Sequence, residues 1–425
     1  MFSILKKTKK DKKVVVMGLD GIPYSLLINY IEKGIMPKFA ELCKTGNLYK
    51  MNSTLPEVSS VAWSSFMTGK NPGEHGVFGF MEIDKQTYEY IFSNFNSLKA
   101  RPFWEREDIK TIAFNIPQTY PARPMNGVMV SGFVAIDMKK ATYPERVFNY
   151  LKETGYKLDV DAKLAPENPD AFFSDLFDTF EKRQKTIEYL YENEEWQLFI
   201  GTITETDRLH HFFFDSASNG RYFHIFEKFY KQLDSFIGLM AQKAKKDGAL
   251  FLTCSDHGFT TIKTELYLNR WLIENGYLKI DRVDGLKGIN PDSKAFCLDP
   301  SRIYIHEEGK FSKGRVKKSD KEAIIDELKT KFGEITFEGQ KIIKQIYSKN
   351  EIFQGDYVED APDIYLLPNY GFDLKGAINK DSIFGTTYFR GMHTYDDAHL
   401  FISVPININN DLNIKDIMHF IMKYF

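Results

Sequence analysis

Six side chains of metal-binding type follow or flank short apolar runs of this sequence. The runs at residues 14–17, 198–203 and 249–253 are each followed within eight residues by carboxylates or histidines. The six side chains are Asp20, Asp207, His211, Asp256, His257 and His393. Carboxylates and imidazoles in this ratio are typical ligands of zinc or manganese. Two such ions about 3.5–4 Å apart would clamp the attacking and leaving oxygens of an in-line displacement at phosphorus.

This chemistry needs a hydroxyl nucleophile, and Ser59 is the best candidate. Pro56 ends an extended segment, Ser59 can cap a helix that runs to about residue 67, and Gly69 provides a left-handed end. A hydroxyl at the start of a helix faces free N–H groups and the positive end of the helix dipole, which favour an alkoxide and a bound phosphate. Ser60 is the rival nucleophile, one residue out of register.

The apolar runs that precede these residues must position them, and their composition predicts buried parallel strands. The five runs of this kind are residues 14–17, 111–114, 198–203, 249–253 and 399–404. Helical patterns lie between them at residues 24–33, 38–44, 170–194 and 222–245. Strands that alternate with helices indicate an α/β fold with a doubly wound, mostly parallel sheet. In such a sheet, ligands bind beyond the carboxyl ends of the strands.

Two stretches do not follow this alternation and predict insertions. Residues 263–363 hold a charged run and scattered short strand patterns, which indicate an inserted subdomain. Residues from about 80 to 180 contain irregular, aromatic-rich segments that would suit a cap over the edge of the sheet. The metal-binding core is therefore expected to comprise residues 1–262 and 364–425.

Other residues near these motifs have ordinary structural explanations. An isolated Asp-Gly pair would indicate a turn, and only the co-occurrence of the six ligands on successive strand ends favours a metal site. His75, His210 and His399 are expected to support the structure or pack beside the site. Aromatic residues that could line a substrate pocket, although packing is the expected role of most, are Phe78, Phe80, Tyr88 and Tyr90.

The composition narrows the classes of partner. The formal net charge of −2 argues against general nucleic-acid or membrane binding, and a small-molecule phosphoester suits it better. The three cysteines are few and unclustered, which indicates a reducing compartment. No apolar run approaches the roughly 20 residues of a membrane span, so the expected location is cytoplasmic. The sequence gives no indication of the oligomeric state.

Five motifs, in order along nearly the whole chain, resemble the type I phosphodiesterase and nucleotide pyrophosphatase family of the alkaline phosphatase superfamily. They are residues 18–21 (GLDG), 56–69 with 71–76 (NPGEHG), 207–211, 255–258 (SDHG) and His393. The resemblance implies one metal ion held by Asp207, His211 and His393. It implies a second ion held by Asp20, Asp256 and His257, with Ser59 as the nucleophile that also contacts it.

The chain departs from this family at two positions. Thr is usual where Ser59 stands, and an Asn is usual three residues later, where this chain has Ala62. Asn115, after a predicted strand, is a candidate for the missing phosphate-binding group. The resemblance implies a metal-dependent phosphodiesterase or nucleotide pyrophosphatase with two divalent ions, zinc or manganese, and a substrate that could be a nucleotide. Phosphomonoesterase, phosphonate monoester hydrolase and phosphoryl transferase or mutase activities remain alternatives, as does an inactive binding protein.

Overall fold

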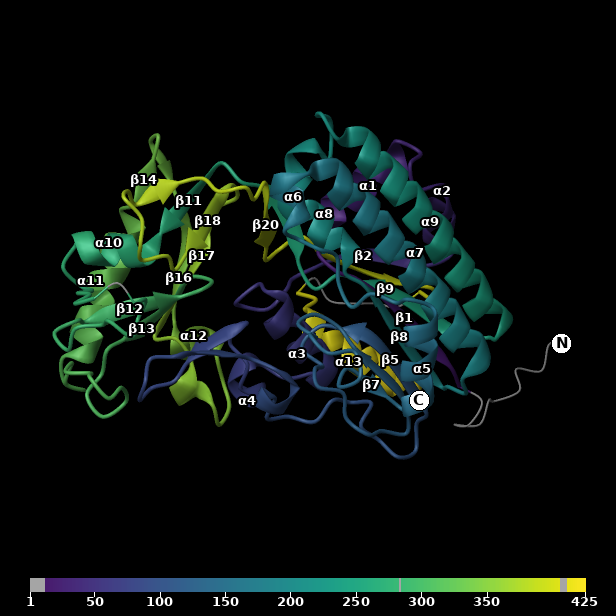
Figure 1. Cartoon of the computed structure of the whole chain (residues 1–425), viewed down its shortest axis with the longest axis horizontal. Helices are drawn as coiled ribbons and strands as arrows, with labels where there is room; N and C mark the ends of the chain where they lie inside the picture. The colour runs from purple at the N-terminus through teal and green to yellow at the C-terminus, as the bar shows by residue number, and fades with distance from the viewer. Residues whose placement is uncertain (1–11, 283, 406–410) are drawn as a thin grey trace.

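The structure is a computed structural model that describes residues 12–282, 284–405 and 411–425. It has two lobes, which lie side by side in Figure 1. The larger lobe is built on an eight-stranded sheet, and the smaller lobe holds a four-stranded and a three-stranded sheet.

The eight-stranded sheet confirms the predicted α/β fold. Its strands, in spatial order, are β2 (Asn47–Met51), β21 (Ala398–Ile402), β9 (Leu250–Cys254), β1 (Val14–Leu19), β8 (Leu198–Ile203), β5 (Thr111–Ile116), β6 (Gly127–Ser131) and β7 (Thr142–Tyr143). The five strands from β9 to β6 are parallel. Every residue of β1, β5, β8 and β9 is buried, as expected for strands covered on both faces.

One strand direction was predicted wrongly. The run at 399–404 forms β21, but it pairs antiparallel with β9 instead of parallel. Only residues 395–397 separate β21 from β20 (Gly391–Thr394), which lies at the carboxyl end of the parallel strands. A parallel strand would have to begin at the opposite end of the sheet, which needs a crossover of a dozen or more residues.

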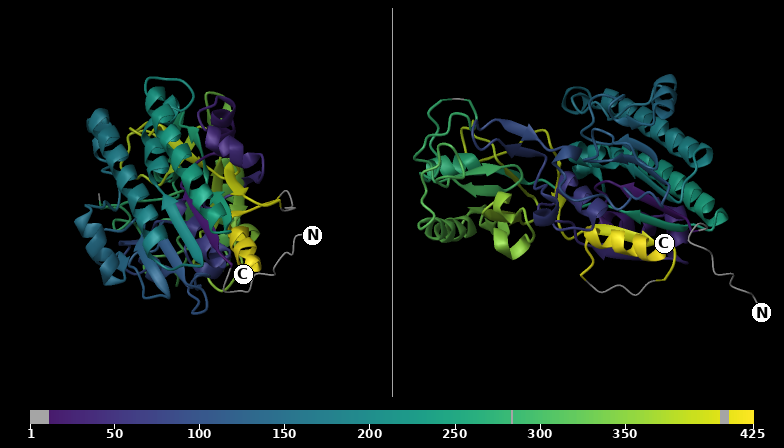
Figure 2. Two further views of the ribbon diagram at one scale, coloured as in Figure 1. Left: turned by 90° about the vertical axis from the view of Figure 1, so that its right-hand side faces the viewer. Right: turned by 90° about the horizontal axis from the view of Figure 1, so that it is seen from below.

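Helices cover both faces of this sheet. Val15 and Met17 of β1 pack with α1 (Tyr24–Glu32), α2 (Pro37–Cys43), α7 (Pro169–Asn193) and α9 (Phe223–Lys246). Val14 and Val16 pack with α3 (Ser59–Thr68) and α13 (Ile417–Tyr424) on the other face. Figure 2 shows the long teal helices and the yellow α13 on opposite sides of the sheet. None of the helices in the described part of the chain is long and apolar enough to cross a membrane.

The smaller lobe has its own apolar core. Its strands are β12 (Ala295–Leu298), β13 (Arg302–Ile305), β17 (Ile364–Pro368) and β16 (Ile343–Ser348) in one sheet and β18 (Phe372–Lys375), β11 (Thr264–Tyr267) and β19 (Phe384–Gly385) in the other. The helices α10 (Leu268–Glu274) and α11 (Lys321–Gly333) pack on them. The predicted boundaries at 263 and 363 stay a prediction, and β17 and β18, beyond 363, pair with strands that precede it.

A short hairpin from the predicted cap packs into the smaller lobe. The hairpin of β3 (Met81–Ile83) and β4 (Tyr90–Phe92) belongs to the predicted cap, and its turn residue Tyr88 lies in the core of the smaller lobe. The remaining elements include α4 (Pro72–His75), α5 (Glu145–Glu153), α6 (Leu164–Glu167), α8 (Glu205–Phe213), β10 (Gly258–Thr261), β14 (Thr336–Phe337), β15 (Gln340–Lys341) and α12 (Lys349–Ile352).

Gly18 permits a close approach between β1 and α3. A Cβ atom at this position would lie 2.6 Å from Cη2 of Trp63 and 2.8 Å from Oγ1 of Thr202. We therefore expect Gly18→Ala to lower the free energy of unfolding by about 1–3 kcal/mol, measured from the denaturant midpoint. Gly333→Ala is the control, because its nearest neighbour is 3.9 Å away. Equal midpoints for the two variants would contradict this packing.

Candidate metal centre

Three neighbouring parallel strands end in the predicted ligands. Asp20 follows β1, Asp256 and His257 follow β9, and Asp207 and His211 lie one turn apart on α8, which begins just after β8. The strands are in register, so their carboxyl ends meet at one edge of the sheet. The five side chains therefore converge on one point, although more than 180 residues separate Asp20 from the other four.

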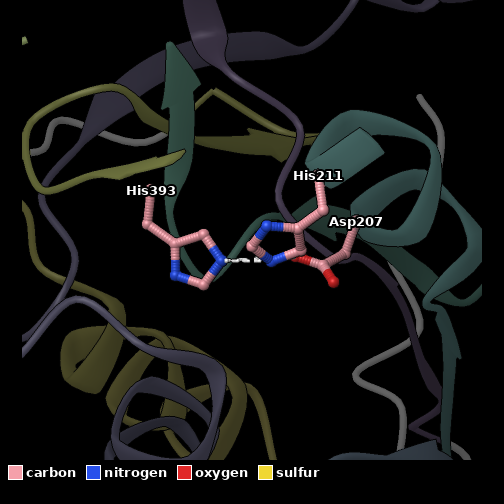
Figure 3. Close-up of side chains that lie close together, drawn as sticks. All are labelled: Asp207, His211 and His393. Carbon is pink, nitrogen blue, oxygen red and sulfur yellow. Dashed lines mark hydrogen bonds and ion pairs between the residues drawn. The ribbon is translucent and has the colours of Figure 1, made fainter. Parts of the chain in front are cut away.

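One cluster contains Asp207, His211 and His393, drawn in Figure 3. Asp207 Oδ1 lies 3.3 Å from Nε2 of His211 and 3.4 Å from Nε2 of His393. The two Nε2 atoms are 3.0 Å apart. His393 reaches the cluster from β20, opposite the helix that carries the other two residues (Figure 3). This group has one carboxylate and two imidazoles within reach of a single cation.

A second cluster shares Asp207 and adds Asp20 and His257. Nε2 of His257 lies 3.8 Å from Asp20 Oδ1 and 3.9 Å from Asp207 Oδ1. Asp256, predicted as a ligand here, is not one of these three, but its Oδ2 lies 3.3 Å from the same Nε2. All six predicted ligands are thus brought together by the fold.

Hydrogen bonds leave the ligand atoms free to face a cation. Nδ1 of His393 lies 2.9 Å from the Glu57 carbonyl oxygen, and Nδ1 of His257 lies 3.0 Å from that of Gly258. A carbonyl only accepts, so both Nδ1 atoms carry the proton and both Nε2 atoms present a lone pair to the cluster. Asp207 Oδ1 and Asp256 Oδ2 are buried without a hydrogen-bond partner in the described structure. Lone pairs that face one another in this way fit a metal ion between them.

Burial and mutual repulsion shift the acid–base behaviour of this cluster. Burial, with Asp256 and Asp207 nearby, raises the pKa of Asp20 well above its usual value, and burial raises the pKa of Asp256 to about 7. Burial also raises the pKa of Asp207, but attraction to His211 outweighs this and holds it well below its usual value. The pKa of His257 is well below its usual value because of burial. Its imidazole is therefore neutral, as a metal ligand requires.

Ser59 lies beside the second cluster at the first turn of α3. Val58 is extended and precedes the helix, so Ser59 lies at the end of α3 where the first backbone N–H groups have no carbonyl of a preceding turn. Its Oγ is 3.4 Å from Asp20 Oδ1 and 3.2 Å from His257 Nε2. The rival Ser60 is fully buried, and its Oγ has no hydrogen-bond partner in the described structure.

Several supporting residues were not predicted from the sequence. Trp63 Nε1 donates to Asp20 Oδ2 at 3.0 Å, and Thr206 Oγ1 donates to the Asp20 carbonyl at 2.6 Å. Trp63 lies four residues after Ser59, so helical spacing alone could have placed the two on one face of α3. Tyr365, from the smaller lobe, donates to Oε2 of Glu57, whose carbonyl holds His393. No sequence pattern links residues 57 and 365.

The three histidines that were expected to have structural roles all have hydrogen-bond partners. His210 contacts the Gly21 carbonyl and Tyr230, and His399 contacts the Ile22 carbonyl and Thr253. His75 bonds Ser65 and the Val77 amide. Burial lowers the pKa values to about 3 for His75 and His210 and to about 4 for His399.

The predicted phosphate-binding candidate Asn115 and the neighbouring cation Arg208 are both occupied by other partners. The Asn115 amide donates to the Thr202 carbonyl at 2.9 Å and to Thr204 Oγ1 at 3.2 Å, so no donor is left for a phosphate. The Arg208 guanidinium donates hydrogen bonds to both carboxylate oxygens of Asp159, the shortest from Nη2 to Oδ2 at 2.6 Å.

The candidate aromatic residues divide into two pairs. Phe78 and Tyr88 are buried in apolar cores, whereas Phe80 and Tyr90 line pockets.

Comparisons with known proteins show the family and the fold of this chain. Residues 14–396 match the family model described as type I phosphodiesterase/nucleotide pyrophosphatase. Among curated proteins, no sequence matches this chain significantly. Phosphonoacetate hydrolase from Sinorhizobium meliloti 1021, solved with phosphonoformate, is 15% identical with a TM-score of 0.68, covering 97% of this chain and 96% of that one. Murine ectonucleotide pyrophosphatase/phosphodiesterase 5 is 14% identical with a TM-score of 0.56, covering 97% and 94%. An inactive threonine-to-alanine variant of the murine protein was solved with AMP.

The raised pKa of Asp256 predicts a pH-dependent instability of the metal-free protein. Because burial raises this pKa from 3.8 to about 7, the folded state holds the proton more tightly than the unfolded state. The resulting stability is present below about pH 4 and is lost as the pH rises to about 7. We expect metal-free Asp256→Asn to be more stable than the metal-free wild type at pH 8 by on the order of 2 kcal/mol, and equally stable at pH 4.

Urea denaturation with a chelator across this pH range measures the difference. Added zinc should stabilise the wild type more than the variant, because the variant lacks one negative charge at the cluster. A metal-free wild type that is more stable than Asp256→Asn at pH 8 would show that the pKa of Asp256 is not raised in the folded protein.

Proposed function

Because this chain belongs to the type I phosphodiesterase/nucleotide pyrophosphatase family of the alkaline phosphatase superfamily, we propose that it is a metal-dependent phosphodiesterase with Ser59 as its nucleophile. Membership makes it a hydrolase of phosphoester bonds. The observation that carries the finer proposal is the position of Ser59 Oγ, 3.4 Å from Asp20 and 3.2 Å from His257, at the edge of the ligand clusters.

The proposed metal ligands divide into two sets. Asp207, His211 and His393 would hold one divalent ion, and Asp20, Asp256 and His257, with Ser59, would hold the other. Nitrogen and oxygen ligands without cysteine suit zinc, with manganese as the alternative. Bound ions would supply charge stabilisation for the attacking and leaving oxygens.

The protein's own groups orient the reaction. Ser59 donates a hydrogen bond to Asp20 Oδ1, which directs its Oγ toward the cluster. Attack forms a bond between Oγ and phosphorus while the bond from phosphorus to the leaving alcohol oxygen breaks, and the proton lost from Oγ ends on the leaving alcohol. Water then cleaves the Oγ–phosphorus bond of this serine phosphodiester, which releases the phosphomonoester and returns a proton to Oγ. The free N–H groups at the start of α3 favour the negative charge on the phosphoryl group.

The family's neighbours indicate the type of substrate. The two solved neighbours are recorded with a phosphonate and with AMP, so a small molecule with a phosphoryl or phosphonyl group is the proposed substrate. The cytoplasmic location expected from the cysteine content stays a prediction. Cys43, Cys254 and Cys297 are free thiols in the structure.

Loss of a ligand to the first ion should change the metal content. We expect wild-type protein loaded with zinc to bind two equivalents and His393→Ala to bind one, because the variant leaves only Asp207 and His211 at that site. Metal analysis after gel filtration measures the stoichiometry, and His419→Ala is the control. Two tightly bound ions in His393→Ala would refute the assignment.

Loss of the nucleophile should stop turnover without emptying the site. Ser59→Ala is expected to lower kcat by roughly three orders of magnitude or more, because the phosphoserine can no longer form, while folding and metal content are kept. Ser60→Ala should retain kcat within about threefold of the wild type. If Ser60→Ala is inactive and Ser59→Ala is active, the nucleophile is the neighbouring residue.

The charge near the site should favour diesters over monoesters. Arg208 is paired with Asp159 and is not free to neutralise the second charge of a monoester. We expect kcat/KM for bis-p-nitrophenyl phosphate to exceed that for p-nitrophenyl phosphate by about tenfold. Arg208→Ala should leave this ratio unchanged within about threefold. A ratio below one would overturn the diesterase proposal. Loss of the monoesterase activity in Arg208→Ala would then identify Arg208 as the residue that binds the monoester.

A further inference from the structure

A pocket opens directly from the ligand clusters and lies between the two lobes. It has a volume of about 250 Å³, and His211 and His393 form part of its wall. The opposite wall comes from the smaller lobe, where Ser301 and Leu374 lie. A group bonded to a phosphorus atom held at the clusters would therefore enter this pocket.

Apolar side chains form most of its surface. They come from both lobes and from the segment that contains β3, and they include Phe80, Met81, Pro300, Leu374 and Met392. Phe80 is held against Phe133, with ring centroids 5.3 Å apart, so this wall is packed from behind. Flat and flexible apolar side chains of this kind bind hydrocarbon surface.

The charged residues of the pocket leave no cation free. Lys375 is the one lysine or arginine among the described residues that line it, and its Nζ lies 2.7 Å from Asp373 Oδ2. Two further carboxylates line the same pocket, Glu57 and Asp299. Three acidic side chains therefore surround it against one lysine, which is already paired.

A second pocket of about 490 Å³ continues from the first and shares Met81, Asp299 and Lys375 with it. It adds the aromatic side chains of Tyr90, Tyr267 and Phe389. Larger substrates therefore have room to extend along the same apolar path.

We infer that the substrate carries an uncharged, apolar organic group on its phosphoryl centre, and that Asp299 and Asp373 exclude anionic groups from this pocket. The inference rests on the proposed function and names the substrate class of that site. A nucleoside polyphosphate places a second phosphate next to the reacting one. Here that phosphate would meet carboxylates and a lysine already paired with Asp373, which costs binding energy through like-charge repulsion.

A matched pair of diesters tests this selectivity. Diphenyl phosphate and bis(4-carboxyphenyl) phosphate carry the same group on both oxygens, so the pocket receives a neutral or a charged ring whichever ester enters. The carboxylate makes its phenol the better leaving group, so slower turnover of the charged diester cannot come from intrinsic reactivity. We expect kcat/KM for diphenyl phosphate to be at least about tenfold higher.

Two variants of the zinc-loaded protein separate charge from other effects. Asp373→Asn keeps the shape of the side chain and frees Lys375, so it should reduce the preference at least about threefold. Asp326→Asn makes the same charge change at an exposed position on α11 and should leave the preference for diphenyl phosphate unchanged.

Binding separates this inference from the proposed function. The dissociation constants of both diesters for zinc-loaded Ser59→Ala, measured by calorimetry, should show the same preference without turnover. Absence of wild-type turnover on either diester, with this binding preference kept, would contradict the proposed function alone. Equal or tighter binding of the charged diester, or no response to Asp373→Asn, would overturn the inference.

Discussion

The carboxylates of Asp20, Asp207 and Asp256 are 2%, 7% and 0% exposed and face one another across the ends of three strands. Burial raises the pKa values of Asp20 and Asp256, and the charges of the neighbouring carboxylates raise them further. Divalent cations between these carboxylates and the lone pairs of the imidazoles would offset this repulsion. Burying a charged carboxylate without a partner is unfavourable. The surrounding structure must therefore hold these side chains in place.

The backbone meets this constraint through close approaches that a side chain would block. Gly21 adopts φ +67°, and its N–H donates to Asp256 Oδ1 at 3.0 Å. A Cβ atom there would lie 2.7 Å from the Phe259 ring. Phe259 pairs with His393 between β10 and β20, so the turn after β1 and the last ligand are packed through one aromatic ring. The smaller lobe adds Tyr365, which holds Glu57 and through it the His393 tautomer. It also supplies one wall of the pocket beside the ligand clusters.

Much of this arrangement follows from local sequence. The strand at 198–203 has the predicted bounds, and five of the six ligands follow strands whose parallel order brings their ends together. The direction of β21 could not be inferred from its own residues, because it depends on the end of the sheet at which the preceding strand, β20, lies. His393 was predicted as a ligand from the family resemblance, but its place on a two-stranded ribbon was not. Contacts such as Arg208 with Asp159 and Tyr365 with Glu57 join distant residues by side chains alone, which no periodicity records.

A crystal structure of the zinc-loaded protein, with anomalous scattering measured at the zinc edge, tests the two proposed metal sites directly. We expect two peaks about 3.5–4 Å apart, one among Asp207, His211 and His393 and the other among Asp20, Asp256 and His257, within bonding distance of Ser59 Oγ. A single peak, or zinc bound away from these residues, would contradict this proposal.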